Sequence, residues 1–167
     1  MGLLAVTLLV AGFGPDYFPL EVGNQWTLQS ASSETLTIEV LRSRQHAGIT
    51  WYLVSGYANG PRWVRKSASG ELFALNERGA DEITTESLLA HLAPGVAGYR
   101  TALSGCKQAA RPSADSASAL TVGYSADQCR DIGITRETYA PGVGLTRRSV
   151  TTFRGEITYE LVSARLR

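Results

Sequence analysis

The sequence predicts an all-β fold with minor helix, in which a single antiparallel meander of about nine strands curls into a half-barrel or barrel. The first observation is a series of short runs in which apolar and polar residues alternate, with many β-branched residues. The second is the presence of glycine-containing turn dipeptides between these runs. The third is size and composition: 167 residues, 44% hydrophobic and 19% charged, suit one soluble domain that can bury a core.

Strands in the first half of the chain are placed by alternation and by turns. The run Glu34 to Leu41 alternates cleanly, which is typical of a strand with one buried face. The run Ile49 to Tyr57 is rich in apolar and aromatic residues throughout, so we expect both of its faces to be covered. Asn59 and Gly60 then predict a hairpin turn. In this half, strands are expected at residues 24–31, 34–41, 49–57, 61–67 and 71–76.

The middle of the chain changes character. The stretch Asp81 to Leu92 reads as mixed strand and short helix, and Pro94-Gly95 breaks it. The stretch Cys106 to Ala119 is small and polar with one proline, and we expect a mobile loop there.

Strands return in the last third, where "RETYAPGVGLTRR" could form either a phosphate-binding loop or a turn between strands. A phosphate loop is followed by a helix, but here β-branched residues follow in alternation. Pro141 presets the dihedral of a type II turn and Gly142 supplies its positive φ, while Gly144 allows a close backbone approach or a bulge. The stretch therefore predicts a structural turn, and strands are expected at residues 120–126, 133–140, 144–153 and 156–166.

The N-terminus favours export. Residues Leu3 to Phe13 carry no charge and are too few to span a bilayer, which suits a secretory signal; the alternative is a buried first element of a cytosolic domain. We therefore expect a targeting segment at residues 1–14, a single β-rich domain at 15–167, and a periplasmic or extracellular location. In an oxidising compartment, Cys106 and Cys129 are expected to form a disulfide that ties the polar loop to the sheet.

Catalytic and cofactor motifs are missing from the sequence. His46 and His91 lie in no nucleophile motif, and Asp81, Glu82 and Glu86 follow no metal-loop pattern, so we expect no catalytic residue, no metal and no cofactor. The net charge of +1, from 16 basic and 15 acidic residues, argues against nucleic acid as a partner. We also expect no stable membrane span.

Aromatic residues are frequent in the expected strands. They either fill the core, which is their usual role, or line an apolar ligand cavity in the concave face of the curled sheet. The cavity candidates are Trp51, Leu53, Trp63 and Phe73.

Two stretches carry a resemblance to a known family. "DYFPLEVGNQWTL", Asp16 to Leu28, is similar to the Tyr-Phe-Pro-Leu-x-x-Gly-Asn-x-Trp opening of many exported bacterial proteins of unknown function. Residues Asp131 to Arg165 resemble their closing block, which contains Ala-Pro-Gly-Val-Gly-Leu, and "GELFAL" at Gly70 to Leu75 resembles one of their central strands.

The resemblance implies an exported β-rich domain and brings no established activity. The sequence thus favours a non-catalytic exported domain with a binding or structural role, whose partner is an apolar small molecule or another exported protein. The alternatives are a carrier of a lipid or other apolar ligand in the concave face, and a hydrolase.

Overall fold

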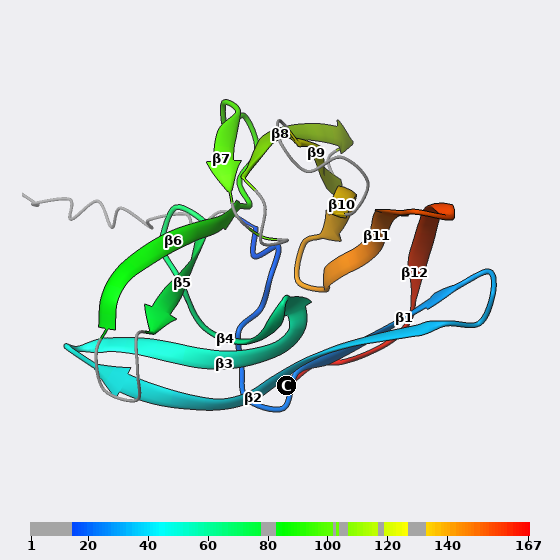
Figure 1. Ribbon diagram of the computed structural model, residues 1–167. Coiled ribbons are helices and arrows are strands. Elements are labelled where there is room, and N and C mark those ends of the chain that lie inside the picture. The colour runs from blue at the N-terminus through cyan, green and yellow to red at the C-terminus, as the bar shows by residue number, and fades with distance from the viewer. Residues whose placement is uncertain (1–14, 78–82, 102, 104–106, 117–118, 127–132) are drawn as a thin grey trace, which may run out of the picture.

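Twelve antiparallel strands form a single sheet in the computed structural model, which describes residues 15–77, 83–101, 103, 107–116, 119–126 and 133–167 (Figure 1). No helix occurs among these residues. Along the sheet the order is β6-β5-β4-β3-β2-β1-β12-β11-β10-β9-β8-β7, so nearly every strand lies beside its sequence neighbour. The strands are β1 (Gln25–Ser30), β2 (Thr35–His46), β3 (Ile49–Ala58), β4 (Gly60–Lys66), β5 (Glu71–Glu77), β6 (Ile83–His91), β7 (Tyr99–Thr101), β8 (Gln108–Ser116), β9 (Ala119–Ala126), β10 (Gly133–Ala140), β11 (Gly144–Thr152) and β12 (Gly155–Arg165).

The sheet curls until its two ends, β6 and β7, approach each other, which gives a nearly closed barrel. The ends meet through a side chain rather than through a backbone ladder. The Thr101 hydroxyl donates a hydrogen bond to the Leu89 carbonyl at 2.6 Å. The all-β fold and the curled antiparallel meander are therefore confirmed, with twelve strands in place of about nine.

The three additional strands correct two expectations. The mixed segment is the strand β6, and the predicted minor helix is absent from the described residues. The polar stretch expected to be a loop contains β8, which pairs with β9 along its length but with β7 only from Gln108 to Ala110. Pro112 lies beyond that short overlap, at a position where a missing N–H costs no ladder bond to β7.

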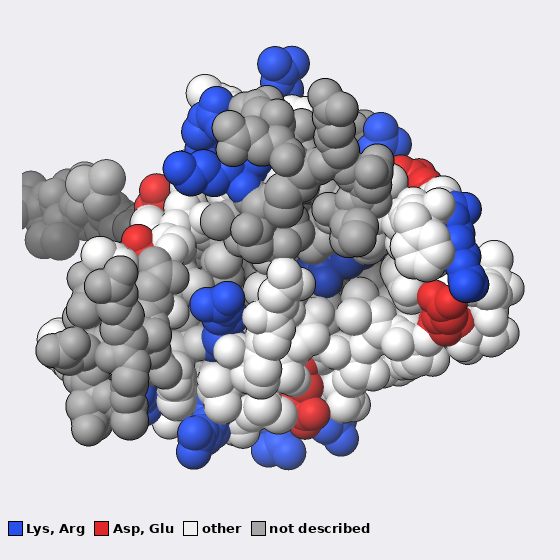
Figure 2. All heavy atoms as spheres, in the orientation of Figure 1, with Lys and Arg blue, Asp and Glu red and all other residues white. Residues whose placement is uncertain are grey.

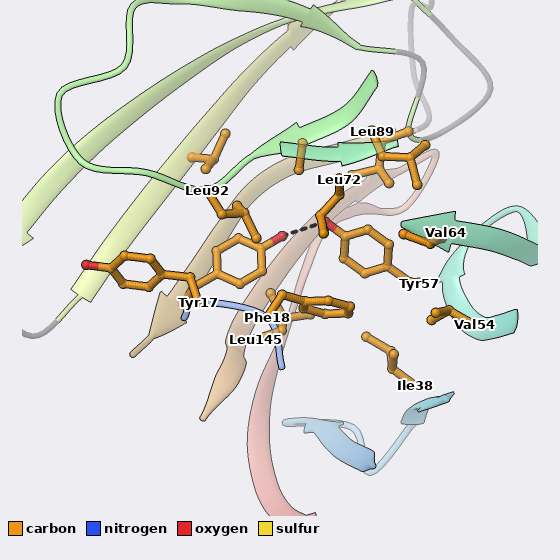
Figure 3. Packing of buried hydrophobic residues seen from close by; sticks show 14 of the residues in the cluster. Tyr17, Phe18, Ile38, Val54, Tyr57, Val64, Leu72, Leu89, Leu92 and Leu145 are labelled. Carbon is orange, nitrogen blue, oxygen red and sulfur yellow. Dashed lines mark hydrogen bonds between the residues drawn. The ribbon is translucent and has the colours of Figure 1, made fainter. Parts of the chain in front are cut away.

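The core fills the inside of the curl (Figure 3). Phe18, from the segment before β1, is fully buried there and stacks on Trp26 with ring centroids 5.0 Å apart. It also lies 4.9 Å from the ring of Tyr57. The inward residues that surround it include Ile38, Val40, Val54, Val64, Leu72, Ala74, Leu120, Val122, Tyr139 and Leu145.

The turn between β10 and β11 joins the start of the domain to its end. Val143 N–H donates to the Ala140 carbonyl at 3.2 Å, and Gly142 has a φ of +71°. The Trp26 indole donates to the Val143 carbonyl at 2.6 Å. Gly144 lies directly against that indole, because an added Cβ would come within 2.7 Å of its nitrogen. The opening and closing motifs therefore pack against each other, and Pro141 lies in a turn between two strands.

Strand β3 has a buried residue on each face, in the direction that its apolar composition led us to expect. Val54 is 1% exposed within the core, and Trp51 is 2% exposed on the other face. An inward-facing Tyr57 requires a bulge at Gly56, which has a φ of +74° and no room for a Cβ beside the Thr37 carbonyl.

Candidate functional site: the outer face of β2 to β6

The four residues expected to line a ligand cavity share one face of the sheet. Leu53 and Trp63 are register partners across β3 and β4. Trp51 lies two residues before Leu53 and so points to the same side. Phe73, on β5, is the register partner of Arg65, which is two residues after Trp63.

This shared face is the outer one, which corrects the expectation of a concave cavity. The intervening residues Val54, Val64 and Ala74 belong to the core cluster, whereas Trp51, Leu53, Trp63 and Phe73 do not. The sequence could not decide this point, because residues of both parities in β3 are apolar and either face could have been turned inward.

Arginines cover the rings on this outer face. The guanidinium carbons of Arg44 and Arg42 lie over Trp63, 4.2 Å and 5.4 Å from the ring centroid. Arg65 lies over Phe73 at 4.3 Å and over Trp51 at 5.7 Å. Such cation–π contacts are favourable by roughly 0.5–2 kcal/mol each, depending on solvent exposure. We call Trp51, Leu53, Trp63 and Phe73 with Arg42, Arg44 and Arg65 the arginine–aromatic face.

A carboxylate of β6 bonds to an arginine of this face. Glu86, on β6, accepts hydrogen bonds from Arg65 Nε at 3.0 Å and from its Nη2. The hydrogen bond to Glu86 raises the pKa of Arg65 above its ordinary value. Arg42 is exposed and forms no ion pair with any residue that the structure describes. Figure 2 shows Lys and Arg side chains projecting along the lower rim of the molecule, where β2 and β3 lie in Figure 1.

The outer surface over β9 to β12 has a different chemistry. Hydroxyl side chains line that surface and bond to one another, as do Thr121 and Thr138 at 3.1 Å and Ser149 and Thr158 at 2.8 Å. This is the usual polar outer face of an antiparallel sheet. The arginine–aromatic face is therefore a local departure from that rule, restricted to one half of the sheet.

A buried ionic cluster lies inside the barrel. Arg148 donates to Glu137 Oε1 from Nε at 2.9 Å and from Nη2 at 2.6 Å. The hydroxyls of Tyr124 and Tyr139 donate to Glu137 Oε2 at 2.6 Å and 2.7 Å, and Tyr57 bonds to Tyr139 at 2.8 Å. Every carboxylate oxygen therefore has two donors, which suits a structural network and leaves no group poised for chemistry.

The electrostatics of this cluster hold its tyrosines in the neutral form. Burial, reinforced by the charge of Glu137, raises the pKa values of Tyr57, Tyr124 and Tyr139 well above the ordinary value. Burial alone would lower the pKa of Arg148, but the attraction of Glu137 outweighs it and the pKa is raised. The cluster thus contains one stable ion pair and three hydroxyl groups.

A cavity of about 440 Å³ lies at one mouth of the barrel. Its walls are the segment Pro15 to Phe18, the β4–β5 turn, and residues Leu92 to Pro94. Lys66, at its edge, bonds to Asp16 Oδ2 at 2.5 Å and to the Phe18 carbonyl at 3.1 Å. This size falls in the range of small-molecule sites.

The remaining candidate residues do not converge. His46 ends β2 and is exposed, and His91 ends β6 with its ring 6.2 Å from that of Tyr99. Within the described part of the chain, no group of His, Cys, Asp and Glu gathers where it could hold a metal ion. Asp81, Glu82 and the cysteines Cys106 and Cys129 lie outside the described residues, so the disulfide stays a prediction.

Sequence reasoning missed the charged residues that matter here. Arg42 and Arg44 are two residues apart in a strand, so their spacing could have placed them on one face. Glu137 gave no such signal, because a register shift between Ile134 and Arg136 turns it inward.

Comparisons with known proteins leave the family open. No family model matches the chain, and no curated protein matches it. Among solved structures, a "putative lipoprotein" from Parabacteroides distasonis ATCC 8503 is similar over 91% of this chain and 99% of its own, with 12% identity and a TM-score of 0.44. A likeness this distant carries no argument about function. Among the residues searched, no helix has the length and hydropathy needed to cross a bilayer.

Proposed function

We propose that the protein is an exported, non-catalytic binding domain that docks on another exported protein through the arginine–aromatic face. One observation carries the proposal: Trp51, Leu53, Trp63 and Phe73 form an apolar cluster on the outer side of β3, β4 and β5, where arginines lie over the rings. Outer faces of antiparallel sheets are normally polar, and contiguous apolar surface is characteristic of interaction sites. The uncharged segment Leu3 to Phe13 supports export.

The composition of the face also favours a protein partner. Tryptophan and arginine are the residues most enriched where interface energy concentrates, and lysine is depleted there. The cations around Trp63 and Phe73 are all arginines. The ion pair between Arg65 and Glu86 would lie at the rim, where such pairs contribute little to affinity.

Site-specific photo-crosslinking in the producing cell tests this proposal. A photoreactive residue replaces Leu53 in one variant and Thr37 in a matched control; Thr37 is exposed on the outer surface of β2. We expect one discrete crosslinked product from position 53, lost on Trp63→Ser, and none from position 37. Equal products from both positions, or none from either, would contradict the proposal.

A second candidate function is the binding of a small molecule in the mouth cavity. The observation that favours it is the cavity itself, which has the apolar walls Leu92 and Pro94 and the polar groups of Lys66 and Ser69. Native mass spectrometry of the purified protein would show a bound small molecule that is lost on Ala93→Phe, a change that fills the cavity. A wild-type protein that shows only the mass of its own polypeptide, with no bound molecule, would exclude this function.

A further inference from the structure

The arrangement of Arg42 and Arg44 over Trp63 suggests what the outer face recognises. Both guanidinium groups lie over one indole ring, and Arg42 is exposed to solvent. A guanidinium that stacks on an aromatic ring leaves its N–H edge available, and that edge matches the two oxygens of a carboxylate. The ring beneath restrains the arginine, so less conformational freedom is lost when the carboxylate binds.

Resting on the proposed function, we propose that the partner supplies an acidic segment, in which an Asp or Glu side chain binds Arg42 and a neighbouring apolar side chain packs on Leu53. The local charge agrees with this partner. Three arginines lie over the rings of the face, and Glu86 bonds to one of them, Arg65. Arg42 has no carboxylate of its own among the described residues, so a partner would not have to break an existing ion pair there.

The same face already contains an example of the proposed contact. Arg65 lies over Phe73 and directs two nitrogens to the two oxygens of Glu86. This internal pair shows that an arginine stacked on a ring of this sheet can hold a carboxylate by both of its oxygens. Arg42 also lies over a ring, with its guanidinium carbon 5.4 Å from the Trp63 centroid, and differs from Arg65 in forming no ion pair with a described residue.

Selection from a random peptide library displayed on phage, using the full-length protein as bait, tests the inference. We expect selected peptides to be rich in Asp and Glu beside an apolar or aromatic residue. Their dissociation constants would be measured by fluorescence anisotropy. Arg42→Gln should weaken binding by roughly 10-fold or more, because a charge-assisted hydrogen bond is lost, and Arg42→Lys should recover only part of that loss.

The control variant is Arg147→Gln, which removes an exposed arginine from the hydroxyl-lined half, and it should leave affinity unchanged. Peptides without acidic enrichment, or equal affinity for wild type and Arg42→Gln, would overturn the inference. If Trp63→Ser still abolished binding in that case, the docking face would stand and only its acidic preference would fail. Stronger Arg42-dependent binding to vesicles of equal phosphatidylglycerol and phosphatidylcholine than to the peptides would instead assign the face to a lipid surface and overturn the inference.

Discussion

The buried pair of Glu137 and Arg148 allows a sharp test of what holds the barrel together. In Glu137→Gln the side chain keeps its shape but loses its charge, and one of its two acceptor oxygens becomes an amide donor. Arg148, whose side chain is 4% exposed, is then left without a counterion. The new amide N–H group also faces another donor, which is either the Arg148 guanidinium or the hydroxyls of Tyr124 and Tyr139. Breaking a buried ion pair from one side costs roughly 3–5 kcal/mol.

The matched control is the neighbouring pair of Arg147 and Glu160, on the outer surface. Their side chains are 54% and 68% exposed and their charged atoms are 3.8 Å apart. Glu160→Gln is therefore expected to cost about 0–1 kcal/mol, the ordinary contribution of an exposed pair.

Urea unfolding followed by tryptophan fluorescence at neutral pH measures both free energies of unfolding. The double variant Glu137→Leu with Arg148→Met should be destabilised by less than the sum of its single changes, because no unpaired charge remains buried. Equal effects of Glu137→Gln and Glu160→Gln, or strict additivity in the double variant, would refute the reasoning.

Three further predictions concern stability. Gly144→Ala should lower the free energy of unfolding by about 2–4 kcal/mol, because the added Cβ would press on the Trp26 indole and the residue has a φ of +102°. Gly142→Ala, whose Cβ would have no atom within 4 Å, should lower it by about 1 kcal/mol. Urea unfolding of both variants separates the effect of the clash from that of the backbone strain. Phe18→Ala should lower the free energy of unfolding by about 3–5 kcal/mol by emptying the centre of the core, and a loss below 1 kcal/mol would show that Phe18 does not pack there. Burial raises the pKa of Tyr99 to about 12, so the folded state retains this proton at a pH where the unfolded state has lost it. The free energy of unfolding should therefore fall as the pH rises from about 10 to 12. Unfolding free energies that stay constant over that range would contradict this prediction.

The sequence was a good guide to the fold wherever one parity of a strand is apolar. In β2 the alternation correctly places Ile38 and Val40 on the buried face, where both are 0% exposed. The polar stretch that contains β8 gave no such signal, because small and polar residues can form a strand when neighbouring strands supply the ladder. The formation of a strand in this stretch therefore depends on its pairing with β9 and not on its own residues.

The candidate site was harder to predict than the fold. The sequence assigned Trp51, Leu53, Trp63 and Phe73 to the concave face, because alternation alone could not tell the inner face from the outer one. That choice depends on which residues meet across the barrel, such as Tyr57 and Tyr139, which are 82 residues apart in the chain. The bulges at Gly56 and before Arg136 change strand parity, and no alternation pattern reports them.

The central claim, that partners dock on the arginine–aromatic face, is tested most directly by the indole N–H signals of the protein in two-dimensional ¹H–¹⁵N NMR. The chain has three tryptophans, and each supplies one signal. Trp51 and Trp63 lie on the outer face, whereas Trp26 is in the core and bonded to the Val143 carbonyl. On addition of a selected acidic peptide, we predict that the Trp63 signal shifts most, that the Trp51 signal follows, and that the Trp26 signal stays in place. A shift of the Trp26 signal with unchanged Trp63 and Trp51 signals would contradict the claim.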